Sequence, residues 1–541
     1  MLEKPFGIWL VVALLGIVLS SSGLSALSGG RTGQAQLASD QESSALAQVQ
    51  DVDWPQLQHD AARTGRTSAS VNPARIRARW IWFGSDWVLR NRDSEPGNPS
   101  WNDDLASYEG HDLRIPLSVP FHFAESMQPL IVGGKVFVGD VKMNKVWALS
   151  LDDGATLWEA DNPGGTAWSG VATHSIVVFP SLLGYVTAWD AQTGAELWQI
   201  DTGKTISHSP ALVEDTLYVA SQNGRVYSIN IHDGRVNWQT DTGAPIQSGL
   251  AVSEGRVFVG NEAMYAVSLD AQTGQEIART RLIGQSFRRI WPVVAGGRVI
   301  WRTVPVIAVG SEYFLDGVID GTDDRFEDEQ MKLRDWLDGD GKLYQHYFAL
   351  DVETMSLDYA IPNGPVGGIG HHADPPVVDS QGRPLTWWPT YFGTISTCSF
   401  GCPPGYDVDI ASFDLVTGLG VQLPNPRGVT IFDVETDNTF AMTMGGDVLY
   451  LRQTFRGTRA IDFSRMQSYW VSAIYRWRDC GGWQAPLNYA QGVPGCPEGS
   501  WEGVIQVPNE SEEFLGHTAP AVVPGLICFT ETFAVTCMED Y

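Results

Sequence analysis

The chain has 541 residues, with 63 Asp and Glu against 35 Lys and Arg, and therefore a formal net charge of −28 at pH 7. This surplus of carboxylates excludes nucleic acid as the main partner, because the neutralisation of phosphates requires a basic face, and it disfavours docking on an anionic membrane surface. Only 18% of the residues are charged and 43% are hydrophobic, which excludes a disordered acidic tail.

The chain begins with an uncharged apolar run, residues 6–19, which small residues follow. The run is shorter than the roughly 20 residues that a membrane span needs, as is typical of a secretory signal peptide. We predict a signal peptide over residues 1–28, with an uncleaved membrane anchor as the alternative, and a flexible linker rich in Gly, Ser, Gln and Ala over residues 29–52. The protein is therefore expected to be secreted or extracytoplasmic, in the periplasm or at the cell surface, and to touch a membrane only through this segment if it stays uncleaved.

A repeat of 40 residues follows in the middle of the chain. Trp158, Trp198 and Trp238 each end a similar phrase that begins with a Gly turn, and Ala278 takes the Trp position in the next unit. The third unit is predicted to contain four short strands separated by turns, at residues 210–213, 217–219, 225–229 and 235–240. A fixed period of this length with four strands is typical of a propeller blade, and the Trp is expected to fill the wedge between neighbouring blades.

The number of blades follows from a phrase that opens each of them, a polar residue, then Pro or a small residue, then an apolar pair. It recurs at residues 128, 169, 209, 248, 291, 374 and 518, with a weaker unit over 438–463. The last unit ends before its outer strand, which residues 77–83 can supply, and this closure removes exposed sheet edges. We predict an all-β fold, an eight-bladed β-propeller of four-stranded antiparallel blades over residues 53–541, with insertions at about 84–123, 316–345, 393–407 and 465–515.

Two features of the sequence resemble a known family. These are the segment from Asp53 to Gly65 and units of the form Ala-x-Asp-x-x-Thr-Gly-x-x-x-Trp, such as residues 188–198. They resemble the PQQ-like (quinoprotein-like, WD40-like repeat) eight-bladed propeller superfamily, where PQQ is pyrroloquinoline quinone. The resemblance covers the chain from about Asp53 to its end and implies the propeller fold. It leaves the function open, since the family includes quinone-dependent dehydrogenases and non-catalytic scaffolds.

The dehydrogenase branch of this family implies a quinone on the ring axis with calcium and a catalytic carboxylate. Under that alternative, Asp374 or Glu125 would be the carboxylate and Arg289 would polarise the quinone carbonyl. We expect the blade-opening residues to converge on one mouth of the central channel. The blade-opening positions offer Glu125, Gln128, Trp168, His208, Gln247, Arg289, His371, His372, Asp374 and His517. The candidates among them for binding a planar, polyanionic ligand are Trp168, His208, Gln247, Arg289, His371 and His517. Polar residues around a wet axis are the competing interpretation, and we favour it.

An acidic stretch from Asp316 to Asp340 holds ten Asp and Glu residues. Asp338 and Asp340 flank a Gly as in part of a calcium loop, but Trp336 stands at the first ligand position and no Glu closes the loop. We expect a solvated insertion within blade five, with weak calcium binding as the alternative.

All six cysteines lie in the last third of the chain. In an exported protein an even number favours disulfides, and the local pairs are the simplest of 15 connectivities. The predicted pairs are Cys398 with Cys402, Cys480 with Cys496, and Cys528 with Cys537. For Cys398 and Cys402, zinc binding is the alternative.

These observations favour a monomeric, non-catalytic module at the cell envelope that binds protein or polysaccharide through its loop insertions. No cofactor is expected under this interpretation. The alternative is a dehydrogenase for alcohols or sugars that depends on PQQ and calcium.

Overall fold

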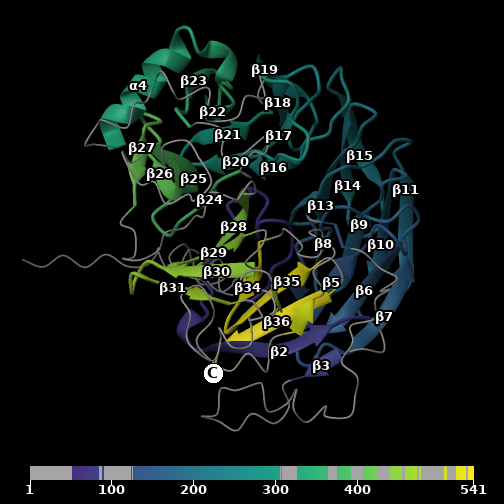
Figure 1. Ribbon diagram of the computed structural model, residues 1–541. Coiled ribbons are helices and arrows are strands. Elements are labelled where there is room, and N and C mark those ends of the chain that lie inside the picture. The colour runs from purple at the N-terminus through teal and green to yellow at the C-terminus, as the bar shows by residue number, and fades with distance from the viewer. Residues whose placement is uncertain are drawn as a thin grey trace, which may run out of the picture. The chain divides into compact units, whose positions relative to one another are not determined.

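The computed structural model describes most of the chain from Val52 onward (Figure 1). The chain divides into two compact units, Met1–Val49 and Gln50–Tyr541, and every described residue lies in the second. The predicted signal peptide and linker therefore lie outside the described residues, and no described helix is long and apolar enough to span a membrane. The described residues are 52–84, 88–90, 123–124, 126–304, 306, 318, 326–363, 375–391, 406–423, 439–453, 457–471, 474–476, 505–507, 519–531 and 534–540.

The second unit is an eight-bladed propeller, as predicted. Each blade is an antiparallel sheet whose first strand lies nearest the ring axis, where the first strands of successive blades contact each other. From inner to outer strand, the blades are β4 (Leu130–Val132), β5 (Lys135–Gly139), β6 (Lys145–Ser150) and β7 (Thr156–Asp161); β8 (Val171–Ala172), β9 (Ile176–Pro180), β10 (Tyr185–Asp190) and β11 (Glu196–Asp201); β12 (Ala211–Val213), β13 (Thr216–Ala220), β14 (Arg225–Asn230) and β15 (Val236–Asp241); β16 (Leu250–Ser253), β17 (Arg256–Gly260), β18 (Tyr265–Asp270) and β19 (Glu276–Arg281); β20 (Val293–Ala295), β21 (Arg298–Arg302), β22 (Tyr347–Asp351) and β23 (Leu357–Ala360); β24 (Val377–Val378), β25 (Pro384–Tyr391), β26 (Tyr406–Phe413) and β27 (Gly420–Gln422); β28 (Thr439–Gly445), β29 (Val448–Gln453), β30 (Gly457–Asp462) and β31 (Gln467–Trp470); and β34 (Ala521–Val523), β35 (Leu526–Glu531), β36 (Ala534–Asp540) and β2 (Ile76–Trp82).

The N-terminal strand closes the ring, which confirms the prediction for residues 77–83. Strand β2 pairs antiparallel with β36, with Trp80 opposite Cys537, and β3 (Val88–Arg90) adds a fifth strand outside it. A disulfide joins Cys528 to Cys537 across β35 and β36, which confirms the third predicted pair. The other four cysteines lie outside the described residues.

The repeated tryptophans pack between neighbouring blades, as predicted. Each indole Nε1 donates to a backbone carbonyl of the next blade, such as Trp198 to Ile231 at 2.8 Å. The Gly in the turn beneath, such as Gly234 with φ +71°, leaves no room for a Cβ, because it would lie 2.8 Å from the Trp198 ring. The same bond links Trp158 to Ala191, Trp238 to Ala271 and Trp80 to Leu151. Trp80 thus joins blade 8 to blade 1, a role that the 40-residue period did not reveal.

A segment that the sequence did not assign to any blade runs along the inside of the ring. Residues 54–71, here called the inner belt, form hydrogen bonds with the innermost part of every blade in turn (purple inside the ring in Figure 1). Strand β1 (Arg66–Thr67) within it pairs parallel with β28. The contacts, from blade 1 to blade 8, are Trp54 with Ile131, Pro55 with Ala172, the Gln56 side chain with Leu212, Ala61 with Val252, Ala62 with Val294, Thr64 with Val378, Gly65 with Met444, and Ser70 with Gly525.

The two faces of the ring differ. Connections between the second and third strand of a blade, and between one blade and the next, lie on one face, here called the decorated face. The helix α4 (Phe326–Asp338), the 3-10 helix η2 (Lys342–Tyr344) and the parallel pair β32 (Ile474–Arg476) and β33 (Ile505–Val507) belong to such connections. On the opposite face, here called the plain face, the described connections are tight turns.

Helix α4 differs from the solvated insertion expected for blade five. It packs over the outer strands β23 and β27, and Gln330, Leu333 and Leu337 are buried. Their spacing of three and four residues places them on one face of the helix, while Asp335 and Asp338 stay exposed. Asp335 and Asp338 of the acidic stretch therefore belong to the outer face of an amphipathic helix.

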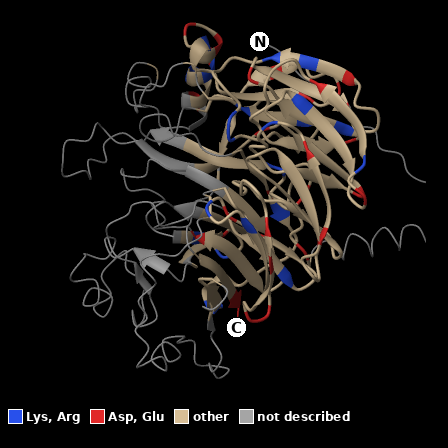
Figure 2. Cartoon of the chain, turned by 90° about the vertical axis from the view of Figure 1, so that its right-hand side faces the viewer, with Lys and Arg blue, Asp and Glu red and all other residues tan. Residues whose placement is uncertain are grey.

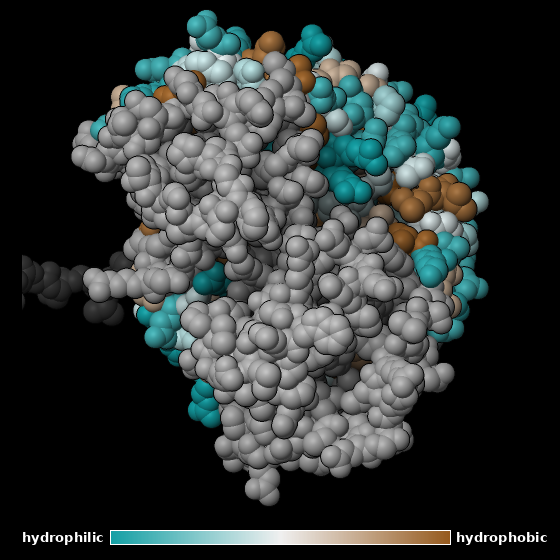
Figure 3. All heavy atoms as spheres, viewed as in Figure 1, coloured by the Kyte–Doolittle hydropathy of each residue, from teal (hydrophilic) through white to brown (hydrophobic). Residues whose placement is uncertain are grey.

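Elsewhere the described surface is mixed in charge and in hydropathy. Figure 2 shows Lys and Arg interspersed with Asp and Glu over the side of the blades in view. Leu157, Leu197 and Ile277 are exposed apolar side chains on the outer strands of blades 1, 2 and 4. Figure 3 shows hydrophobic surface on the outer flank as small separate patches among hydrophilic residues.

Candidate functional site

Two of the predicted channel-mouth residues come together with a third aromatic residue. The rings of Trp168 and His208 stack with centroids 3.7 Å apart and planes 22° apart. Trp291 meets both edge-on, 5.9 Å from Trp168 and 5.6 Å from His208. The connections that precede blades 2, 3 and 5 supply these residues, which form the mouth cluster. Trp291 was not among the candidates, although it stands in the opening phrase of blade 5 just before Pro292.

His208 in this cluster is buried and neutral. Its Nδ1 accepts a hydrogen bond from the backbone N–H of Ser209 at 2.9 Å, so the ring proton belongs on Nε2. Burial holds the pKa of His208 well below its usual value, and the nearby positive charge of Arg63 lowers it further. The Nε2 of His208 and the Nε1 of Trp291 are both buried, and neither has a hydrogen-bond acceptor among the described residues.

Arg63 of the inner belt is fully buried and lies close enough to His208 to affect its pKa. Its guanidinium donates to the carbonyls of Leu57 at 2.7 Å, Pro210 at 2.6 Å and Leu250 at 3.0 Å. Burial lowers the pKa of Arg63 to about 10, against the opposing effect of Asp60, so the group stays charged at neutral pH. Arg63 therefore ties the belt to blades 3 and 4 from within the ring.

The described mouth residues do not fit a planar quinone stacked on Trp168. One face of this indole is covered by the imidazole of His208, and the whole side chain is only 7% exposed. A planar ligand would need a free ring face, and the inner belt already lines the inner strands of all eight blades. A ligand at this position would have to displace His208 from the indole.

The remaining predicted residues are dispersed or lie outside the described part. Gln247 is half-buried, and Arg289 is exposed with φ +63°. Gln128 supports the belt instead, because its side chain accepts from the backbone N–H of Gln58 at 2.8 Å and donates to Ala519 at 3.1 Å. Five further candidates lie outside the described residues: Glu125, His371, His372, Asp374 and His517.

The predicted calcium ligands Asp338 and Asp340 are exposed, at the end of α4 and in the turn after it. Within the described ranges, no three His, Cys, Asp or Glu side chains are grouped so as to hold a metal ion. Calcium binding by this pair stays a prediction.

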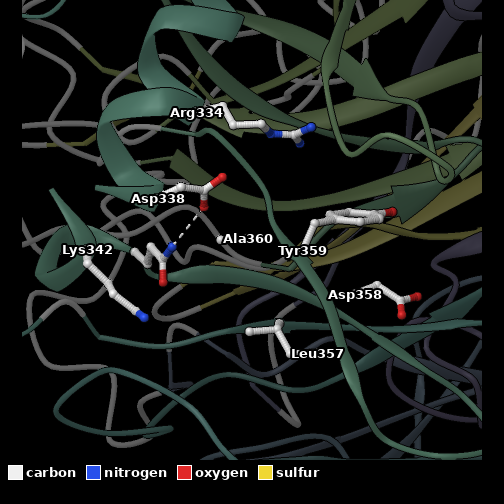
Figure 4. Close-up of a pocket in the computed structure, with 8 residues that line it drawn as sticks. Arg334, Asp338, Lys342, Leu357, Asp358, Tyr359 and Ala360 are labelled. Atoms are coloured by element: carbon white, nitrogen blue, oxygen red, sulfur yellow. Dashed lines mark hydrogen bonds between the residues drawn. The ribbon is translucent and has the colours of Figure 1, made fainter. Parts of the chain in front are cut away.

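A second candidate site lies between α4 and β23 (Figure 4). It is a cavity of about 280 Å³. The cavity is lined by Arg334, Asp338, Lys342, Gln345, Leu357, Asp358, Tyr359 and Ala360. Of these, only Asp338 was a candidate from the sequence.

A comparison of the sequence with protein families finds one family whose model matches its repeats. The family whose model matches is PQQ_2, described as "Outer membrane protein assembly factor BamB", over residues 142–248 and 234–323. These residues include the two outer strands of blade 1, all of blades 2 to 4 and the two inner strands of blade 5. The chain is an eight-bladed propeller with PQQ-like repeats over residues 142–323. No curated protein shows significant similarity to it.

Solved structures that resemble this propeller have low sequence identity to it. BamB from Moraxella catarrhalis is 14% identical with a TM-score of 0.37, over 59% of this chain and 77% of that one. A europium-containing methanol dehydrogenase is 13% identical with a TM-score of 0.46, over 79% and 86% of the two chains. The computationally designed Ika8 protein is 11% identical with a TM-score of 0.46, over 78% and 98%.

Proposed function

We propose that the protein is an extracytoplasmic, non-catalytic binding module that holds a protein or polysaccharide partner on the decorated face of its propeller. The observation that carries the proposal is the inner belt. The chain's own residues 54–71 occupy the inside of the ring, where a ligand on the axis would otherwise contact the blades. The stacked pair of Trp168 and His208 supports the same conclusion, because it covers the aromatic plane that a quinone would need.

The decorated face is the side where the long connections concentrate, and long loops on a rigid scaffold are where binding surfaces form. Near the mouth this face exposes the cationic side chains of Lys204, Arg288 and Arg289. On the plain face, the repeated Asp side chains cap their own turns. Asp190, for example, accepts from the backbone N–H and the hydroxyl of Thr193, both at 2.8 Å, and Asp270, Asp351 and Asp414 repeat this arrangement. These four carboxylates of the plain face thus stabilise the turns in which they lie.

Two observations support a location outside the cytoplasm. The disulfide between Cys528 and Cys537 is of the kind that persists in oxidising compartments. The matching family is described as an outer-membrane protein assembly factor. A binding role for this chain at the cell envelope is consistent with both.

Site-specific photo-crosslinking in cells tests which face binds. A photoreactive amino acid is placed at Lys204 or Arg288 on the decorated face and, as matched controls, at Gln192 or Gln272 on the plain face; all four positions are exposed. We expect a discrete protein or carbohydrate adduct from the decorated positions and none from the controls. Adducts of equal yield from both faces, or from the plain face alone, would contradict the proposal.

A further inference from the structure

The cavity lies between α4 and β23, the outer strand of blade 5 (Figure 4). Arg334 and Asp338 come from the last turns of the helix, and Lys342 and Gln345 come from the turn that follows it. The outer strand of the blade supplies the opposite wall, residues 357–360. The cavity therefore exists because the amphipathic helix packs across the edge of the blade.

Among the described residues, the cations of this cavity make no ion pair, whereas each of its carboxylates has a hydrogen-bonding or ion-pair partner. Within the described residues, neither Arg334 nor Lys342 makes an ion pair, and the Nη2 of Arg334 is buried without an acceptor. Asp358 is paired with Arg298, Oδ2 to Nε at 2.6 Å. Asp338 accepts a long hydrogen bond from the Gln345 amide at 3.4 Å, and Figure 4 shows this contact on the helix side of the cavity.

The aromatic ring of Tyr359 lies beneath the Arg334 guanidinium and holds it in position to bind a ligand. The guanidinium lies 5.9 Å from the centroid of Tyr359, and the Tyr359 hydroxyl donates to the Leu415 carbonyl of blade 6 at 2.6 Å, which fixes the ring. Burial lowers the pKa of Arg334, and the negative charge of Asp338 opposes that shift. Arg334 as a whole is half-buried, but its Nη2 is buried, and a buried N–H without an acceptor is costly. The planar fork of the guanidinium matches the two oxygens of a carboxylate.

We propose that this cavity binds a carboxylate group, held by Arg334, with Lys342 as the second cation and Leu357 as an apolar wall. A carboxylate fits better than a phosphate dianion, because Asp338 and Asp358 also line the cavity and would repel the larger charge more strongly. The carboxylate belongs either to a small organic acid or to the acidic side chain or carboxy terminus of a peptide. The proposal does not depend on the decorated face having a partner.

Titration of the full chain at low ionic strength tests the proposal and separates the two sources. The probes are sodium succinate, an N-acetylated tetrapeptide ending in a free Asp, and succinamide, which has the same shape as succinate without charge. We expect one-to-one binding of succinate or of the peptide, with a dissociation constant of about 1 mM or tighter, and no binding of succinamide. Binding of the peptide alone identifies a peptide source, and binding of succinate identifies a small acid.

Substitutions locate the binding. Arg334→Gln should weaken it about tenfold or more, as expected for the loss of a charge-assisted hydrogen bond, and Lys342→Gln should weaken it less. Arg225→Gln, an exposed arginine of blade 3, is the matched control and should bind as the unaltered chain does. A thermal melt of each variant verifies folding, and Lys342→Gln carries the test if Arg334→Gln does not fold. The proposal is wrong if no carboxylate binds, if succinamide binds equally, or if the cavity variants bind as tightly as the control.

Discussion

A chain that lacks residues 53–83 should show no cooperative thermal unfolding transition. The deletion removes β2, which pairs with β36 along the whole outer edge of blade 8, and with it Trp80, which links blade 8 to blade 1. It also removes the inner belt, whose hydrogen bonds reach all eight blades. An open ring exposes unpaired strand edges and loses a shared inner contact for every blade, so the effect should be global. Circular dichroism during heating measures it.

The control for this deletion is a chain that begins at Gln50, where the compact unit starts. That chain should melt as the full chain does, because it keeps the belt and β2. If the chain without residues 53–83 melted with the same midpoint and steepness as the control, neither element would be needed for closure.

Replacing Arg63 by Met should destabilise the propeller by about 3–5 kcal/mol, the range observed when one partner of a buried, charged hydrogen-bonded group is removed. The guanidinium is fully buried, and its loss leaves the carbonyls of Leu57, Pro210 and Leu250 without their donors. Met retains the aliphatic volume but has no donor. A large decrease in the urea midpoint is the expected result.

Arg225→Met is the matched control for Arg63→Met, since Arg225 is exposed and its guanidinium donates to the Gln239 side chain at 3.3 Å. Its effect should stay within about 0.5 kcal/mol. A loss below about 1 kcal/mol for Arg63→Met would mean that the belt is held by its backbone contacts alone.

The blades could be predicted because their signals are local. Gly turns such as that at Gly234, and a Trp every 40 residues, are set by the chain's own repeat, so strand positions in blade 3 agree with the structure to within one residue. The closing strand followed from counting strands. The inner belt could not be predicted in the same way, because its bonds join backbone groups far apart in sequence, such as Thr64 and Val378, and leave no periodic pattern.

The candidate site, like the fold, could be predicted from the sequence only in part. The opening phrases predicted that Trp168 and His208 lie at one mouth, and the structure brings the two side chains into contact. That they stack on each other depends on how side chains from three connections pack, and sequence spacing carries no such information. Helix α4 was missed because its acidic outer face dominates the composition, although the spacing of Leu333 and Leu337 was a signal for its buried face.

The most direct test of the account is the addition of PQQ and calcium to the purified chain. Tryptophan fluorescence reports a quinone that stacks at Trp168, and dye reduction with alcohols and sugars reports turnover. Because the belt lines the ring and His208 covers the indole, the account predicts no saturable quenching and no dye reduction. Tight binding accompanied by turnover would contradict it and would identify the protein as a quinone-dependent dehydrogenase.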